Sequence, residues 1–244
     1  MIYIVLLAYN EEQSISPAIQ EIAKVLRGED IQIVVVNDGS TDQTKEKVEA
    51  LAKTCHTVVV SHLKNLGVGQ ALRTGLSYVN ERGQDENVVV VMEADGTSDS
   101  LVLPEMIRKI RGGVDVVCAS RYCNGGGYKG FPWFRLVCSR GANALLAFFF
   151  PVKGIRDYTI FYRGYRLSAI RKAYEHYGDR LVTCRGFAAN GEILLKLRPL
   201  GLRFAEVPLR YNYGQKKSPS KIRILKTISE YLRLSWKGSV CREF

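Results

Sequence analysis

The sequence predicts an α/β fold built on an open, mainly parallel sheet flanked by helices, with amphipathic helices toward the C-terminal end. The first observation behind this prediction is that strongly apolar, β-branched runs alternate with segments of helical spacing up to about residue 120. The second is that residues 87–92 (NVVVVM) form an almost wholly apolar run, as is typical of strands buried on both faces. At 244 residues the chain suits one large domain, although length alone also allows two small ones.

The spacing of apolar residues defines each element in turn. Residues 13–27 place Ile15, Ile19 and Ile22 on one helical face, and residues 87–92 (NVVVVM) are the clearest buried strand. The other predicted strands are the β-branched runs at 2–7, 31–36, 57–61 and 115–119. The other predicted helices cover 69–79, about 104–111, and a stretch that follows the second strand and ends near residue 53. Residues 123–130 (CNGGGYKG) are expected to form a loop.

The charge of the chain indicates an acidic partner. Lys and Arg total 35 against 24 Asp and Glu, which gives a formal net charge of +11. Nucleic acid, an anionic membrane surface and phosphorylated substrates all fit such an excess, and charge alone does not choose among them. The six cysteines contain no CxxC pair, so neither a zinc site nor a disulfide framework is expected, and a reducing cytosol is the simpler interpretation.

The apolar segments predict contact with a membrane surface and not a crossing of it. The longest apolar run, residues 144–152, is far shorter than the ~20 residues that span a bilayer, and the N-terminal run is expected to be a strand. Residues 145–150 (LLAFFF) either enter lipid or pack in the core. Residues 221–237 interleave basic and apolar side chains, the pattern of an interfacial helix. A tail over residues 226–244 is therefore predicted to lie on a membrane.

Polar side chains follow three of the predicted strands. In an open parallel sheet, ligands bind outside the carboxyl ends of the strands. After the first strand, Tyr9 and Glu11 could stack on and hydrogen-bond a base or ribose, although Asn10 could simply cap a helix. After the second strand, Asp38 could accept a hydrogen bond from a base, although Asp-Gly-Ser is also an ordinary turn.

A pair of carboxylates follows the strand NVVVVM. Glu93 and Asp95 are two residues apart, so both can converge on one cation at the strand end. Hard cations such as Mg²⁺ or Mn²⁺ prefer oxygen ligands of this kind and also bind a diphosphate. Such a metal would stabilise the charge that builds on a leaving nucleoside diphosphate.

Taken together, these motifs resemble family 2 glycosyltransferases of the GT-A fold, which have a Rossmann-like sheet. The later motifs are similar to the dolichol-phosphate mannosyltransferase branch of that family, and the resemblance covers about residues 2–225. The matching segments are the three strand-end loops, NLGVGQA at 65–71, SRY at 120–122, Trp133 with Arg135, SRGAN at 139–143, DYT at 157–159, YRGYR at 162–166, GEIL at 191–194, EVP at 206–208 and SK at 220–221. Residues 1–225 are accordingly interpreted as a GT-A catalytic domain.

The resemblance implies roles for individual residues. Tyr9, Glu11 and Asp38 would bind the nucleoside, with Gly69 and Gln70 also on the substrate side. Glu93 and Asp95 would hold Mg²⁺ or Mn²⁺ and the diphosphate. Arg121, Arg135 and Arg140 would face the acceptor phosphate or the sugar diphosphate, and Lys221 would close over the donor phosphates. The chain departs from the family pattern at Ala8, Asn37, Glu93, Thr97 and residues 213–221.

The implied reaction is the inverting transfer of a sugar, mannose or glucose, from a nucleotide-sugar to a polyprenyl phosphate. The donor would be GDP-mannose or a UDP-sugar. An acceptor phosphate is already an anion, so it needs no general base, but it needs cationic side chains that bring it close to a second phosphate. The expected location is the cytoplasmic face of a membrane, as a peripheral enzyme or one that relies on a membrane-anchoring partner protein.

Three other functions remain open at this point. A family 2 transferase with a soluble glycan acceptor would share the donor site. A nucleic-acid-binding protein would explain the charge, but the sequence lacks zinc-finger, homeodomain and RNP-type patterns, and no nucleic acid is expected. A catalytically inactive, membrane-bound scaffold is the third alternative.

Overall fold

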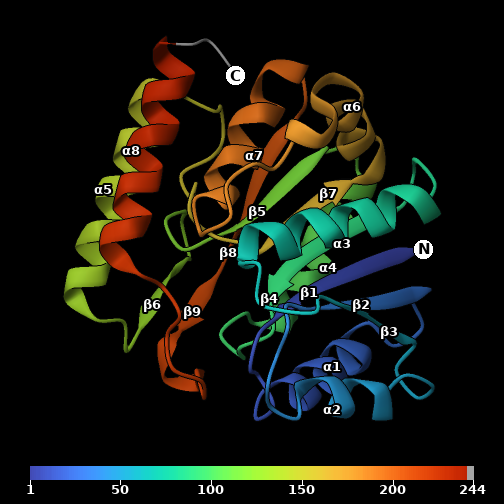
Figure 1. Cartoon of the computed structure of the whole chain (residues 1–244). Coiled ribbons are helices and arrows are strands. Elements are labelled where there is room, and N and C mark those ends of the chain that lie inside the picture. The colour runs from blue at the N-terminus through green and yellow to red at the C-terminus, as the bar shows by residue number, and fades with distance from the viewer. Residues whose placement is uncertain (241–244) are drawn as a thin grey trace.

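A seven-stranded sheet forms the centre of the computed structural model, which describes residues 1–240 and their side chains up to residue 236 (Figure 1). The strand order is β3-β2-β1-β4-β7-β5-β8. Two short strands, β6 and β9, pair separately. The strands are β1 (Ile2–Ala8), β2 (Ile31–Asn37), β3 (Thr57–Ser61), β4 (Val88–Glu93), β5 (Val116–Ser120), β6 (Gly127–Lys129), β7 (Arg163–Arg166), β8 (Phe204–Pro208) and β9 (Arg210–Asn212).

The sheet is mainly parallel, which confirms the predicted fold class. Strand β1 pairs in parallel with both β2 and β4, and β5 pairs in parallel with β8. Only β7 runs antiparallel, between β4 and β5. The chain leaves β1 toward β2 and β3 and later returns to the other side of β1 as β4. This reversal opens a crevice at the carboxyl ends of β1 and β4, the position where such sheets bind ligands.

Helices cover both faces of this sheet. Ile4 and Leu6 of β1 point into one core together with α1 and α4, while Val5 and Leu7 point into the opposite core with α3, α6 and α7. This alternation follows from the two-residue period of a strand, and it requires the all-apolar run that the sequence contains. The helices are α1 (Ile15–Val25), α2 (Thr44–Ala50), α3 (Val68–Arg82), α4 (Leu103–Arg111), α5 (Trp133–Phe149), α6 (Leu167–Tyr177), α7 (Ala189–Leu197) and α8 (Ile224–Val240).

Helices α5 and α8 pack against each other at one edge of the molecule (Figure 1). Leu146 of α5 and Tyr231 and Leu234 of α8 are buried in a third apolar cluster. The predicted division between residues 225 and 226 therefore falls within the first turn of α8. Within residues 1–240, no helix is both long enough and apolar enough to cross a bilayer.

The structure also corrects details of the predicted elements. The stretch 123–130 is not wholly loop, because residues 127–129 form β6 and pair with β9. The apolar run 145–150 is divided: Leu146 and Phe150 are buried, whereas Phe148 and Phe149 are exposed. Of the predicted basic tail, the Lys237 side chain and residues 241–244 lie outside the described part of the chain.

Candidate active site

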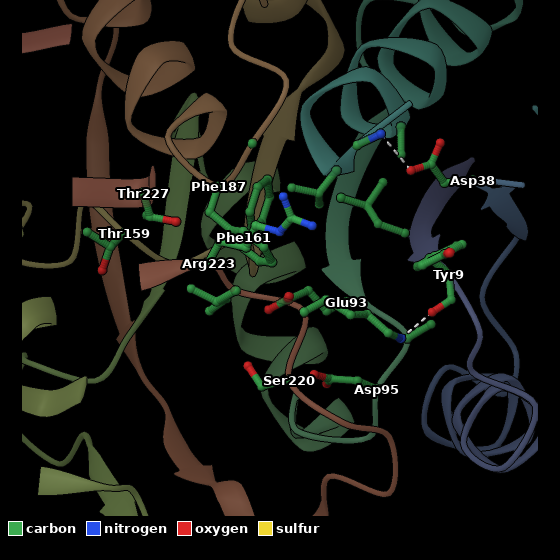
Figure 2. Close-up of a pocket in the computed structure, with 18 of the residues that line it drawn as sticks. Tyr9, Asp38, Glu93, Asp95, Thr159, Phe161, Phe187, Ser220, Arg223 and Thr227 are labelled. Atoms are coloured by element: carbon green, nitrogen blue, oxygen red, sulfur yellow. Dashed lines mark hydrogen bonds between the residues drawn. The ribbon is translucent and has the colours of Figure 1, made fainter. Parts of the chain in front are cut away.

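A cavity of about 640 Å³ lies at the carboxyl ends of the central strands (Figure 2). Tyr9, Asp38, Glu93 and Asp95 line it from the ends of β1, β2 and β4. The opposite wall comes from individual residues of four distant segments, which are 121–135, 159–161, 185–187 and 211–230. Parallel strands thus bring together side chains that are separated by many residues in the sequence.

The predicted carboxylate pair lies inside this cavity. Asp95 is 4% exposed, and its Oδ1 accepts hydrogen bonds from the Thr97 backbone nitrogen at 3.0 Å and from Thr97 Oγ1 at 2.5 Å. Its Oδ2 accepts a hydrogen bond from Lys216 Nζ. Burial and the neighbouring negative charge of Asp95 raise the pKa of Glu93 to about 7. A cation placed between these two carboxylates would favour the ionised form of Glu93.

The pair fits Mg²⁺ or Mn²⁺ only together with a substrate. Among the side chains that the structure describes, no group of three or more His, Cys, Asp and Glu forms a complete metal cage. Mg²⁺ is commonly held by one or two carboxylates, with substrate phosphates and water completing the octahedron. Glu93 and Asp95 match that arrangement, because both line a cavity with room for a diphosphate. Thr97 holds Asp95 in place through its backbone and hydroxyl.

The first strand-end loop places Tyr9 and Glu11 at the cavity, as predicted. Glu11 is 5% exposed, and its Oε2 accepts a hydrogen bond from Ser14 Oγ at 2.8 Å. Its Oε1 accepts from Ser218 Oγ at 2.9 Å and from Lys221 Nζ. The Lys221 ammonium also lies 5.6 Å from the centre of the Tyr9 ring. Lys221 therefore closes over the first strand-end loop, next to the nucleoside-binding residues that the resemblance implies.

Asp38 lines the cavity, but its carboxylate is already engaged by the protein. Oδ1 lies 2.6 Å from His62 Nδ1 and accepts from the Leu66 backbone nitrogen at 2.9 Å, while Oδ2 accepts from Gly67 N at 2.9 Å. Gly67 has φ +97°, a conformation that favours glycine. Asp38 thus fixes the loop that leads into α3, a structural role that the Asp-Gly-Ser pattern did not indicate.

Gly69 and Gln70 are not among the residues that line the cavity. A Cβ atom on Gly69 would lie 1.9 Å from the Cys184 carbonyl oxygen, and Gly69 N donates to the Arg185 oxygen at 2.9 Å. The glycine is needed because α3 packs closely against the loop before α7. The neighbours of Gly69 and Gln70, which are Leu66, Gly67 and Val68, do line the cavity.

Arg121 lies in the cavity wall at the end of β5. Its Nε and Nη2 bind the Asp157 carboxylate at 2.7 and 2.8 Å, and Nη2 also donates to Thr159 Oγ1 at 2.8 Å. Burial disfavours the charge, but Asp157 outweighs it and raises the pKa of Arg121 above its ordinary value. The remaining terminal nitrogen, Nη1, makes no hydrogen bond to the described residues, so a permanently charged donor is available to a ligand.

Arg135 and Arg140 have different environments although both belong to α5. Arg135 lines the cavity, and its Nη1 donates to Tyr213 Oη and Ser220 Oγ, both at 2.8 Å. Its Nε is buried without a partner among the described residues. Arg140 is exposed and does not line the cavity. Five helical residues rotate a side chain by about 140° from the starting face, so one helix cannot present both arginines to one site. The structure therefore brings Arg121 and Arg135 together at the cavity and places Arg140 outside it.

The structure adds cationic residues that the sequence motifs did not identify. Lys216, Arg185, Arg223 and Lys226 all line the cavity, from the segment after β9, the loop before α7 and the N-terminal end of α8. The only sequence signal for Lys216 is its place in the segment 213–221, where the chain departs from the family pattern. Its contact with Asp95 joins residues 121 positions apart, which no local pattern indicates.

This fold is that of a GT-A glycosyltransferase. The sequence model of the family described as glycosyl transferase family 2 matches residues 3–180, and the chain belongs to that family. A dolichol-phosphate mannosyltransferase of Pyrococcus furiosus is 29% identical over 98% of this chain, and the chain spans 65% of the length of that relative. A polyprenol monophosphomannose synthase of Mycolicibacterium smegmatis is 32% identical over 79% of this chain and 72% of the relative.

Similar solved structures confirm the fold. A glucosyl-3-phosphoglycerate synthase of Mycobacterium tuberculosis in complex with Mn²⁺ and UDP-glucose superposes with a TM-score of 0.68. It is 21% identical, and the match covers 98% of this chain and 78% of that one. The same enzyme in complex with Mn²⁺, UDP and glucosyl-3-phosphoglycerate gives a TM-score of 0.68 at 20% identity, over 98% of this chain and 79% of that one.

Proposed function

We propose that this chain transfers a sugar, mannose in the first instance, from a nucleotide-sugar to a polyprenyl phosphate. The observation that carries the proposal is the buried Nε of Arg135, which has no partner among the described residues and belongs to a guanidinium in the cavity wall. A buried, unpaired cationic donor is costly unless a ligand binds it. Guanidinium groups bind phosphate well because they stay charged and offer several fixed donors.

The two ends of the cavity suit the two substrates. Tyr9 and Glu11 would bind the nucleoside, and Glu93 and Asp95 would hold Mg²⁺ or Mn²⁺ with the donor diphosphate. Arg135, together with the free nitrogen of Arg121, would hold the acceptor phosphate. The relatives named as a dolichol-phosphate mannosyltransferase and a polyprenol monophosphomannose synthase support this choice of acceptor and make GDP-mannose the first donor to test.

The reaction follows from this arrangement of charges. An oxygen of the acceptor phosphate attacks the anomeric carbon, the bond from that carbon to the diphosphate oxygen breaks, and the nucleoside diphosphate leaves with the electron pair. Attack opposite to the leaving group inverts the anomeric carbon. The metal, when bound, supplies charge stabilisation for the leaving diphosphate. Arg121 and Arg135 offset the repulsion between two phosphates that must approach each other in line.

We also propose that the α5/α8 edge lies on a membrane surface and delivers the acceptor lipid. On α5, Trp133 is 77% and Phe148 80% exposed, and on α8, Leu225 is 84% and Trp236 69% exposed. Arg233 is a basic side chain of α8, and Arg223 and Lys226, which also line the cavity, lie at the N-terminal end of the same helix. Large exposed apolar side chains beside cationic ones are typical of helices that bind anionic lipid interfaces. The cytoplasmic face is the expected side of the membrane.

Transfer from labelled GDP-mannose, UDP-glucose and UDP-N-acetylglucosamine to a short polyprenyl phosphate tests the proposal. We expect a lipid-phosphate sugar from one donor with Mg²⁺ or Mn²⁺, none with EDTA, and a large loss in Arg135→Ala. Equal or faster transfer to a soluble glycan would favour that alternative acceptor. Absence of any product and of any nucleotide binding would contradict the enzymatic function.

A further inference from the structure

Residues 213–221, here called the closing segment, contribute Tyr213, Lys216, Ser220 and Lys221 to the wall of the cavity. Tyr213 and Ser220 bond Arg135 on one side. Ser218 and Lys221 bond Glu11 on the other side. The segment is thus bonded to both ends of the cavity. Between these contacts it carries two further lysines, exposed Lys217 and partly buried Lys216.

Lys216 lies in a part of the cavity where carboxylates concentrate negative charge. Its side chain is only 12% exposed, and Nζ pairs with Asp95 Oδ2. The charges of Glu93 and Glu11 also act on this ammonium, so it lies in the field of three carboxylates. The ammonium therefore compensates negative charge that a divalent cation would otherwise compensate.

The two cations cannot share Asp95 in this geometry. Oδ1 is engaged by both the backbone and the hydroxyl of Thr97, and Oδ2 by Lys216. Two cations on one buried carboxylate oxygen would repel each other strongly in a partly desolvated site. A divalent ion can therefore bind Asp95 fully only after the Lys216 ammonium leaves it.

We propose that Lys216 competes with the divalent cation for Asp95, and that the donor diphosphate relieves this competition by giving the Lys216 ammonium a new anionic partner. The inference rests on the proposed nucleotide-sugar function and adds a regulatory step to the same site. Because coupling between two ligands is reciprocal, metal tightens nucleotide binding by the same factor by which nucleotide tightens metal binding. The free protein then binds metal weakly, and metal and nucleotide enter together.

Binding of Mn²⁺, followed by the electron paramagnetic resonance signal of the free ion, tests this competition without any turnover. Titrations are made with wild type, Lys216→Met and Lys217→Met, each alone and with saturating GDP or UDP. Lys217 is the matched control because it is adjacent and exposed. We expect Lys216→Met to bind Mn²⁺ about 10-fold more tightly than wild type without nucleotide, the size of an ordinary coupling between ligands. We expect Lys217→Met to match wild type.

The outcomes separate this inference from the proposed function. If wild type binds Mn²⁺ in the presence of a nucleotide, and Lys216→Met has the same Mn²⁺ affinities as wild type both with and without nucleotide, the competition is refuted while the function stands. The competition is also refuted if the Mn²⁺ affinity of Lys217→Met changes as much as that of Lys216→Met. Loss of any nearby positive charge would then be enough to raise the Mn²⁺ affinity. If no protein binds Mn²⁺ under any of these conditions, both the competition and the metal-assisted reaction are overturned. Thermal unfolding of each variant confirms that the fold is intact.

Discussion

The two halves of the cavity are built in different ways. The half formed by β1, β2 and β4 consists of strand ends, and it carries the carboxylates of Glu11, Glu93 and Asp95. The half formed by α5, the closing segment and α8 carries mostly cations, and its outer surface exposes large apolar side chains. An acidic half is suited to a metal and a diphosphate, and a basic half with an apolar outer surface is suited to a lipid phosphate. The comparison predicts that changes in the two halves affect different ligands.

The largest expected effect is on the acidic half. Removing the Asp95 carboxylate eliminates a proposed ligand for the metal and leaves Lys216 without its partner. We expect Asp95→Ala to lower kcat for sugar transfer by about 10³-fold, as loss of a main electrostatic contribution does. The measurement is the initial rate with saturating donor and acceptor. Exposed Glu86, at the opposite end of β4, is the control, and Glu86→Ala is expected to be unchanged.

A smaller effect distinguishes two arginines on one helix. Arg135→Ala removes a cation from the cavity wall, and we expect transfer to fall by about 10²-fold, with a higher KM for polyprenyl phosphate. Arg140→Ala changes the opposite, exposed face of α5 and is expected to stay within a few-fold of wild type. Kinetics over a range of acceptor concentrations check both. A larger loss of transfer in Arg140→Ala than in Arg135→Ala would contradict the proposal that Arg135, and not Arg140, binds the acceptor phosphate.

A stability test addresses the packing of α3, the helix next to the acidic half of the cavity. Gly69→Ala places a Cβ against the Cys184 carbonyl, so we expect a loss of about 2 kcal/mol in the free energy of unfolding, the usual cost of overpacking. Gly141 lies on an exposed part of α5, where a Cβ atom would meet no described atom within 4 Å, so Gly141→Ala removes backbone freedom of the unfolded chain and is expected to stabilise by about 0.5 kcal/mol. Denaturant unfolding measures both. Equal effects would show that α3 does not pack as closely as the structure indicates.

The smallest expected effect concerns the α5/α8 edge, for which we propose membrane contact. Leu225→Asp replaces an 84% exposed apolar side chain on α8, and we expect vesicle binding to weaken about 10-fold, in line with the value of one apolar side chain in lipid. Leu63 is fully exposed on the loop after β3 and provides the control. Sedimentation with anionic vesicles compares the two. If Leu63→Asp weakens binding as much as Leu225→Asp, the membrane does not select the α5/α8 edge.

The two halves also differ in how far the sequence predicts them. The acidic half follows from local patterns, because apolar runs define strands and the parallel order brings their ends together at one edge. Glu93, Asp95, Tyr9 and Glu11 were found in this way. Asp38 was placed at the cavity, but its bonds to the loop before α3 depend on a contact across 29 residues that no local pattern encodes.

The basic half depends on tertiary contacts. Arg135 and Arg140 both belong to motifs that match the family. Only their positions around the axis of α5 show that Arg135 lines the cavity and Arg140 does not. Lys216 meets Asp95 because β8 and β9 carry the closing segment back across the sheet. Strands β7 and β8 were absent from the predicted elements. They carry polar side chains among apolar ones, such as Arg163 and Glu206, and so lack the unbroken apolar run that marked the earlier strands.

The division of the cavity into a donor half and an acceptor half is tested most directly by equilibrium binding. Isothermal titration calorimetry would measure GDP or UDP with Mn²⁺, and separately a short polyprenyl phosphate, against wild type, Asp95→Ala and Arg135→Ala. The account predicts that Asp95→Ala loses metal-dependent nucleotide binding and keeps the lipid phosphate, while Arg135→Ala keeps the nucleotide and loses the lipid phosphate. Loss of the same ligand in both variants would contradict it.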